Sequence, residues 1–150
     1  MDDPQAWSDA RHRGGRLQLG QRGGELSGLG VYGQRYSAAG AKAGAEFRVN
    51  TTVAKDQDDP SVAGFQDGGF VVTWTSLDQD GSGLGVYGQN YDAAGARLNV
   101  EFRVNTTVAK DQWQSAVATL SAGNSIAAWT SRDQDGSLEG VYAQRFSLSR

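Results

Sequence analysis

The segment Phe70-Val71-Val72-Thr73-Trp74-Thr75 decides the fold class of this chain. It consists of β-branched and aromatic residues, which are enriched in strands. Alternate side chains of an extended chain share a face, so Phe70, Val72 and Trp74 are predicted to point the same way. The preceding residues 66–69 read Gln-Asp-Gly-Gly, and Asp-Gly is typical of a tight hairpin turn. The segment therefore predicts a hairpin strand with one apolar face.

Three neighbouring runs also have the character of strands, at residues 61–65, 86–91 and 100–104. The last of them alternates strictly, which predicts that Val100, Phe102 and Val104 face inward. Between the second and third runs, Asp-Ala-Ala-Gly at 92–95 reads as a type I turn. Because no segment has a helical period, the chain is predicted to be all-β.

The strand pattern repeats along the chain with a period of 55 residues, because the motif that starts at Val31 returns at Val86 and Val141. Aligning the two full periods gives about 35 identical positions, as expected of a recent duplication. We therefore divide the sequence into a first repeat unit at 28–82, a second at 83–137 and the start of a third at 138–150.

Residues 1–27 do not follow this repeat. Positions 11–16 read Arg-His-Arg-Gly-Gly-Arg, where the repeat would place apolar residues in alternation. Three explanations stay open: a degenerate repeat unit, a polar cap of the kind that repeat arrays need at their ends, and a segment translated in the wrong reading frame. We expect this segment to be poorly packed.

Tandem units of about 55 residues with four short antiparallel strands each are typical of the blades of a β-propeller. A solenoid of hairpins and a small β-sandwich are the alternatives, but the two separate turns in each unit favour the blade. A propeller needs at least four blades, and about two and a half are present here. We therefore expect an incomplete array, a fragment that further repeat units or other copies of the chain must complete. Open strand edges should promote that association.

The string from Gly68 to Gly95 resembles the tandem repeats of giant adhesins and of RTX-like (hemolysin-type) calcium-binding proteins, which are large secreted bacterial proteins. The resemblance covers roughly residues 28–150. It implies a secreted or cell-surface location, a structural or adhesive role and an association with calcium.

The candidate calcium ligands lie in the loops that follow the two tryptophan-containing strands. They are Asp78, Asp80, Asp133 and Asp135. Alternating carboxylates on a glycine-containing turn, together with backbone carbonyls, supply the hard oxygen ligands that calcium needs. The alternative is that these aspartates only stabilise the turns by accepting hydrogen bonds from backbone N–H groups.

The aromatic residues are candidates for carbohydrate contact. Tyr87 and Tyr142 recur in register, and such rows either stack on sugar rings or pack between neighbouring blades. Trp113 differs because it replaces Asp58 of the preceding unit and lies in a polar segment. We therefore single out Trp113 as the main candidate to contact a cell-surface glycan.

Composition excludes several classes of function. The chain has no cysteine and one histidine, so disulfide frameworks and thiolate zinc sites are excluded and imidazole metal clusters nearly so. A net charge of −3 disfavours nucleic acid as a partner, and no apolar run approaches the roughly 20 residues of a membrane-spanning helix.

The repeats also bear on whether the chain is an enzyme. One active site needs different residues in different roles, and repeat units that are nearly identical do not usually supply them. The acidic cluster Asp56, Asp58 and Asp59 changes to Asp111, Trp113 and Gln114 in the next unit. The sequence therefore predicts that the chain is not an enzyme. The main hypothesis is a non-catalytic extracellular structural or adhesive module stabilised by calcium, and the alternative is a carbohydrate-binding, lectin-like propeller fragment.

Overall fold

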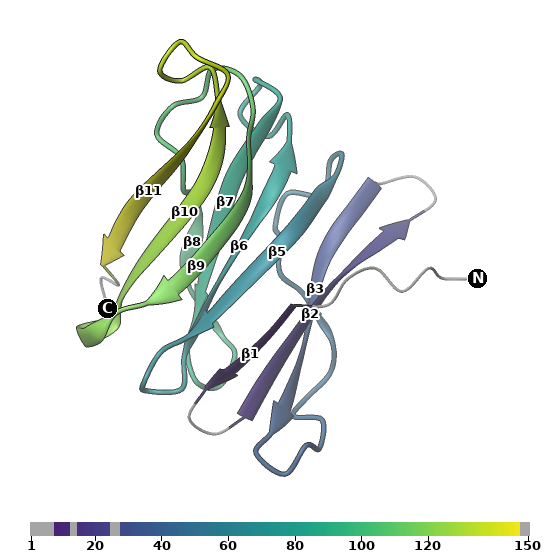
Figure 1. The fold of residues 1–150 in the computed structure, drawn as a ribbon. Helices are drawn as coiled ribbons and strands as arrows, with labels where there is room; N and C mark the ends of the chain where they lie inside the picture. Colours follow the sequence, from purple (N-terminus) through teal and green to yellow (C-terminus); the bar gives the residue numbers. More distant parts are fainter. Residues whose placement is uncertain (1–7, 13–14, 25–27, 148–150) are drawn as a thin grey trace.

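The computed structural model describes residues 8–12, 15–24 and 28–147, which form three antiparallel sheets that follow one another along the chain (Figure 1). The first sheet contains β1 (Ser8–His12), β2 (Gly15–Gly24), β3 (Gly28–Ser37) and β4 (Phe47–Arg48). The second contains β5 (Gln57–Gly64), β6 (Phe70–Leu77), β7 (Leu84–Tyr91) and β8 (Arg97–Arg103). The third contains β9 (Gln112–Thr119), β10 (Asn124–Arg132) and β11 (Glu139–Ser147).

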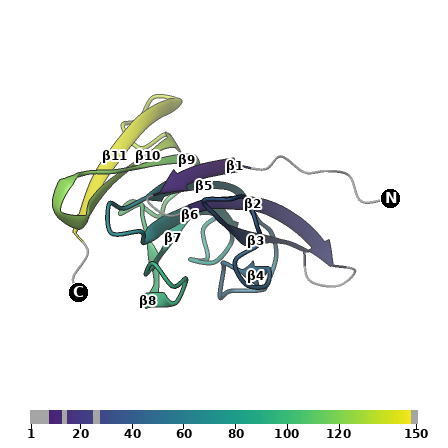
Figure 2. The same ribbon diagram turned by 90° about the horizontal axis from the view of Figure 1, so that it is seen from below.

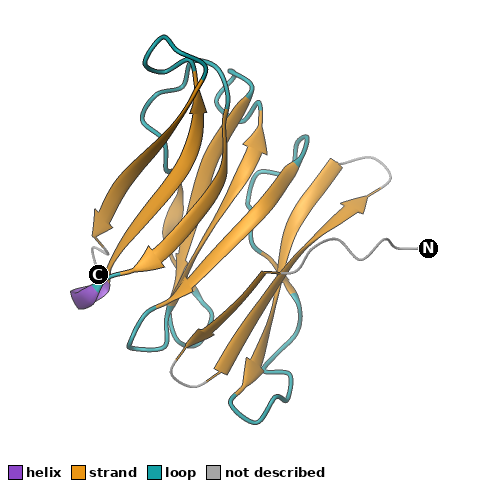
Figure 3. Ribbon diagram, viewed as in Figure 1, coloured by secondary structure: helices purple, strands orange, loops and turns teal. Residues whose placement is uncertain are grey.

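The described residues contain no α-helix, and η1 (Ser121–Gly123) is a single turn of 3-10 helix (Figure 3). The prediction of an all-β chain is therefore confirmed. None of the described elements is a helix long and apolar enough to cross a membrane. The sheets run out of phase with the sequence units, since position 82 lies between β6 and β7 of one sheet.

Both predicted turns of the second sheet are present. Between β5 and β6 the N–H of Phe65 donates to the Gly69 carbonyl at 2.7 Å, and Gly68 takes a φ of 93°. Between β7 and β8 the N–H of Gly95 donates to the Asp92 carbonyl at 3.0 Å. Gly95 has a φ of 85°. Glycine is favoured at positions 68 and 95 because it adopts positive φ angles without steric strain.

The inward direction predicted for Val100 is wrong, because this side chain is 81% exposed. On β8 the residues Leu98 and Phe102 pair with Asn90 and Gly88 of β7, so four steps along β8 match two along β7. The extra residues form a bulge that carries Val100 outward. Val104, beyond the bulge, is buried as predicted.

The expectation that residues 1–27 are poorly packed is wrong for β2. This strand pairs with β3 over its whole length. Leu17 and Leu19, which alternate with polar residues, are fully buried against the second sheet. Positions 1–7, 13–14 and 25–27 lie outside the described residues.

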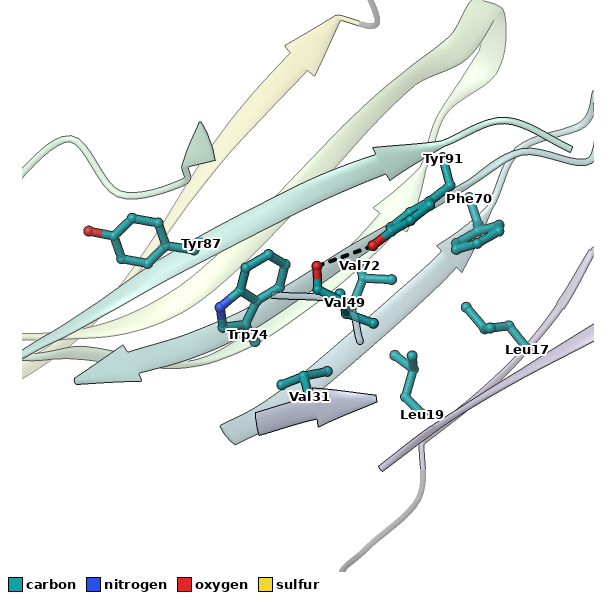
Figure 4. Packing of buried hydrophobic residues seen from close by; sticks show 9 residues of the cluster. All are labelled: Leu17, Leu19, Val31, Val49, Phe70, Val72, Trp74, Tyr87 and Tyr91. Carbon is teal, nitrogen blue, oxygen red and sulfur yellow. Dashed lines mark hydrogen bonds between the residues drawn. The ribbon is translucent and has the colours of Figure 1, made fainter. Parts of the chain in front are cut away.

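Two apolar clusters hold the sheets face to face. The larger one lies between the first and second sheets and is drawn in Figure 4; its buried members are Leu17, Leu19, Val31, Val49, Phe70, Val72, Trp74, Tyr87 and Tyr91. The smaller one joins the second and third sheets through Val86, Val104, Ala127 and Trp129. Phe70, Val72 and Trp74 thus share one buried face, as their alternation predicted.

A buried asparagine ties the third strand of one sheet to the inner strand of the next. Asn50 accepts a hydrogen bond from the Val31 N–H at 2.9 Å and donates to Thr52 O and to Gln57 Oε1. The same three bonds recur 55 residues later, from Asn105 to Val86, Thr107 and Gln112. We call each set an asparagine clasp.

Candidate functional site at the inner strands

The strands β1, β5 and β9 are the inner strands of the three sheets and lie next to one another (Figure 2). Hydrogen bonds join β5 to β9: the Val117 N–H donates to Ser61 Oγ at 3.2 Å, and Thr119 Oγ1 donates to the Gly64 carbonyl at 2.8 Å. The inner strands therefore form a continuous surface to which two successive sheets contribute side chains.

Each of these two inner strands bulges near its start. Asp58 and Ser61 on β5 pair with Thr75 and Thr73 on β6, which leaves one extra residue on β5. Asp59 within this bulge has a φ of 46°, and Pro60 is tolerated there because β5 is an edge strand. The bulge in β9 contains Gln114, with a φ of 52°. Bulges of this kind commonly redirect side chains beside functional sites.

Asp58 has a carboxyl group with a strongly raised pKa. Burial, followed by the negative charges of Asp59 and Asp56, raises the pKa of its carboxyl from 3.8 to about 6. Asp56 is fixed next to it, because its Oδ1 accepts the Leu29 N–H at 2.8 Å. A half-buried carboxyl with this pKa can hold or release a proton near neutral pH.

The raised pKa predicts how Asp58 affects stability. Between about pH 4 and pH 6 the folded state binds a proton that the unfolded state has lost, so the contribution of Asp58 to stability falls as the pH rises. Asp58→Asn should remove this fall and raise the melting temperature at pH 7. Thermal melts from pH 4 to pH 8 test this, with Asp135→Asn in an exposed loop as the control. Identical pH profiles for Asp58→Asn and the unmutated protein would contradict it.

Trp113 occupies on β9 the position that Asp58 occupies on β5. Asp58 pairs with Thr75, and Trp113 pairs with Thr130, which is the equivalent threonine of the third sheet. The Trp113 side chain is half-buried. The next residue is anchored to the second sheet, because the Gln114 N–H donates to Thr75 Oγ1 at 3.3 Å. An acidic and an aromatic residue therefore stand at matching positions of neighbouring inner strands.

The other predicted aromatic contacts lie elsewhere. Tyr87 is on β7 and belongs to the larger apolar cluster, where burial raises the pKa of its phenol. Tyr142 is on β11 and packs against the smaller cluster. Neither tyrosine is on an inner strand with Trp113.

The candidate calcium ligands are engaged in their own turns. Asp78 Oδ1 accepts the Gly83 N–H at 3.1 Å and Oδ2 accepts a hydrogen bond from Lys55, which lowers the pKa of this carboxyl. Asp80 Oδ1 accepts the Ser82 N–H, and its buried Oδ2 lies 4.0 Å from Arg103 Nη1. In the third sheet Asp133 and Asp135 are exposed.

Nowhere in the described part of the chain do three or more carboxylate or imidazole side chains gather as a metal site would require. Asp78 and Asp80 would have to exchange their basic neighbours for the ion. Calcium binding at these loops stays a prediction. Its test is whether calcium raises the melting temperature of the protein, and whether the rise is lost in the Asp78→Asn/Asp80→Asn variant.

No protein-family model and no curated protein matches the chain. Among solved structures, an endo-arabinase from Bacteroides thetaiotaomicron VPI-5482 is similar, with a TM-score of 0.60 and 15% sequence identity. The fold is of the β-propeller type. The match covers 95% of this chain and 56% of the endo-arabinase chain, so this chain spans little more than half of its length.

This comparison contradicts the prediction that the chain is not an enzyme, because a protein of the same fold is one. The exclusion relied on the near-identity of the repeat units. The inner strands are where that premise fails, since Asp58 and Asp59 are replaced by Trp113 and Gln114. This exchange is the signal in the sequence that the units are unequal at the inner strands.

Proposed function

We propose that the inner strands of this propeller-type fold bind carbohydrate, with Trp113 and Asp58 as the central contacts. The observation that carries the proposal is their placement at matching positions of adjacent inner strands. An indole ring stacks on the apolar face of a sugar, and carboxyl groups exchange hydrogen bonds with its hydroxyls. The similarity to an endo-arabinase supports a carbohydrate ligand.

A secreted or cell-surface location is part of this proposal, because polymeric glycans are met there. The adhesive role that the resemblance to adhesin repeats implies is also part of this proposal. Carbohydrate binding would give such a repeat module its adhesive contact.

Hydrolysis of a glycosidic bond is a second candidate function. It is favoured by one observation, the pKa of about 6 for Asp58 beside Asp56 and Asp59. A carboxyl with a raised pKa can serve as the general acid in the cleavage of glycosides. Release of reducing ends from a panel of polysaccharides, abolished by Asp58→Asn, would establish it; no release from any of them would leave binding alone.

Trp113→Ala should weaken binding of arabinan fragments about 2- to 12-fold, the equivalent of about 0.5–1.5 kcal/mol of lost stacking. Isothermal titration or a glycan array measures the change, and Trp113→Phe should retain most of the affinity. Val100→Ala on the exposed bulge of β8 is the matched control and should bind normally. Equal affinity of the Trp113→Ala variant and the unmutated protein would contradict the proposed site.

A further inference from the structure

The free face of the third sheet repeats a surface that is buried elsewhere in the same chain. We define this tail face as Ile126, Ala128 and Thr130 of β10 with Val141 of β11. In the second sheet the equivalent positions are Val71, Thr73, Thr75 and Val86, all buried beneath the third sheet. Val86 is 0% exposed and Val141 is 79% exposed. The tail face therefore has the pattern of a packing surface without its covering sheet.

The backbone N–H and carbonyl of Val141 also differ from those of its equivalent, Val86, in their hydrogen bonds. The Val86 N–H donates to Asn105 Oδ1 at 2.7 Å, and the Val86 carbonyl accepts the Val104 N–H at 2.8 Å. Within the described residues Val141 has neither of these partners. In the first sheet Val31 makes the same two hydrogen bonds, to Asn50 and Val49.

The edge of β11 differs from the matching edges of the first two sheets at one position. In the first two sheets a phenylalanine of the outer strand lies over a glycine, and an added Cβ would come within 2.8 Å of Phe47 Cζ at Gly33 and 2.9 Å of Phe102 Cζ at Gly88. The equivalent residue of β11 is Ala143, which already carries that Cβ. Its methyl group fills the space that these rings occupy over Gly33 and Gly88.

The first sheet presents the complementary surface. We define this head face as Tyr32, Gln34 and Tyr36 of β3, which alternate with the inward-facing Val31. The equivalent residues Tyr87, Gln89 and Tyr91 of β7 are buried, and the two tyrosines pack against the first sheet. Inside the chain, the face of the second sheet that is equivalent to the head face therefore already packs against the face of the first sheet that is equivalent to the tail face.

We propose that two copies of the chain associate head to tail, each tail face covering the head face of the other. Two copies bring six sheets together, which lies within the range of four to eight blades in which propellers close. The two contacts are related by a two-fold axis, so the assembly stops at a dimer. Closure would also surround the inner strands that carry Asp58 and Trp113. The dimer itself does not depend on the proposed carbohydrate binding.

Sedimentation equilibrium or light scattering tests this on the full chain. A dimer has twice the monomer mass of 15.9 kDa. Val141→Arg on the tail face and Tyr32→Arg on the head face should each give a monomer with an unchanged circular dichroism spectrum. Val100→Arg, an equally exposed valine on β8, should remain dimeric. Mixing the two monomeric variants should restore a one-to-one dimer, because one intact contact remains between them.

Three results would overturn the proposal. One is a monomer of the unmutated chain at high concentration. Another is a dimer that Tyr32→Arg leaves intact, which would indicate pairing of two tail faces. The third is a mass that keeps growing with concentration, which would indicate an open head-to-tail chain.

Discussion

Replacing Trp74 with alanine should lower the free energy of unfolding by about 3–5 kcal/mol, the usual cost of removing a buried tryptophan. Trp74 is completely buried between the first and second sheets, among apolar side chains from both. The lost ring leaves a cavity that two paired sheets cannot easily collapse. Because a domain of this size has about 5–15 kcal/mol in total, much of the variant should be unfolded at physiological temperature.

Urea denaturation followed by circular dichroism measures this loss. Trp113→Ala is the matched control, because the same truncation of a half-buried indole on β9 should cost much less. Trp74→Phe should be milder than Trp74→Ala, since it keeps most of the apolar volume and removes an indole N–H that has no hydrogen-bond partner. Equal costs for Trp74→Ala and Trp113→Ala would contradict the account of the core.

Breaking one asparagine clasp should cost about 3 kcal/mol, at roughly 1 kcal/mol for each of its three hydrogen bonds, two of which are buried and one partly buried. Asn50→Ala removes the acceptor of the Val31 N–H and leaves Gln57 Oε1 without its donor. Both groups are buried, so water cannot readily replace the lost side chain. The equivalent change Asn105→Ala should have a similar effect at the junction of the second and third sheets.

The same denaturation experiment measures the cost of Asn50→Ala. Asn124→Ala is the control, because the Asn124 side chain makes one exposed hydrogen bond, to the Ser121 carbonyl. It should cost less than about 0.5 kcal/mol, as surface substitutions usually do. A loss for Asn50→Ala no larger than this control would show that the clasp does not hold the sheets together.

The sequence predicted the strands wherever local pattern and burial agree. Alternation placed Phe70, Val72 and Trp74 on one buried face, and the glycines of both hairpin turns adopt the positive φ angles expected of them. These features depend on residues a few positions apart, which a single sequence displays.

The residues whose burial was predicted wrongly depend on contacts with residues that are distant in the sequence. Leu17 and Leu19 are too few to mark a strand among arginines and glycines, and they become core residues because the second sheet covers them. Val100 alternates like an inward residue, but its bulge is set by the register of β8 against β7.

The candidate site could be predicted only in part. Trp113 was visible as an exception to the repeat. The raised pKa of Asp58 was not, because it comes first from burial in the folded chain and then from the charges of Asp59 and Asp56.

Nuclear magnetic resonance of the tryptophan indole N–H groups shows directly whether the inner strands bind carbohydrate. Arabinan fragments added to the labelled protein should shift the Trp113 signal. The signals of Trp74 and Trp129, which are buried between the sheets, should stay in place. An unmoved Trp113 signal at saturating ligand, or shifts confined to other tryptophans, would contradict a carbohydrate site on the inner strands.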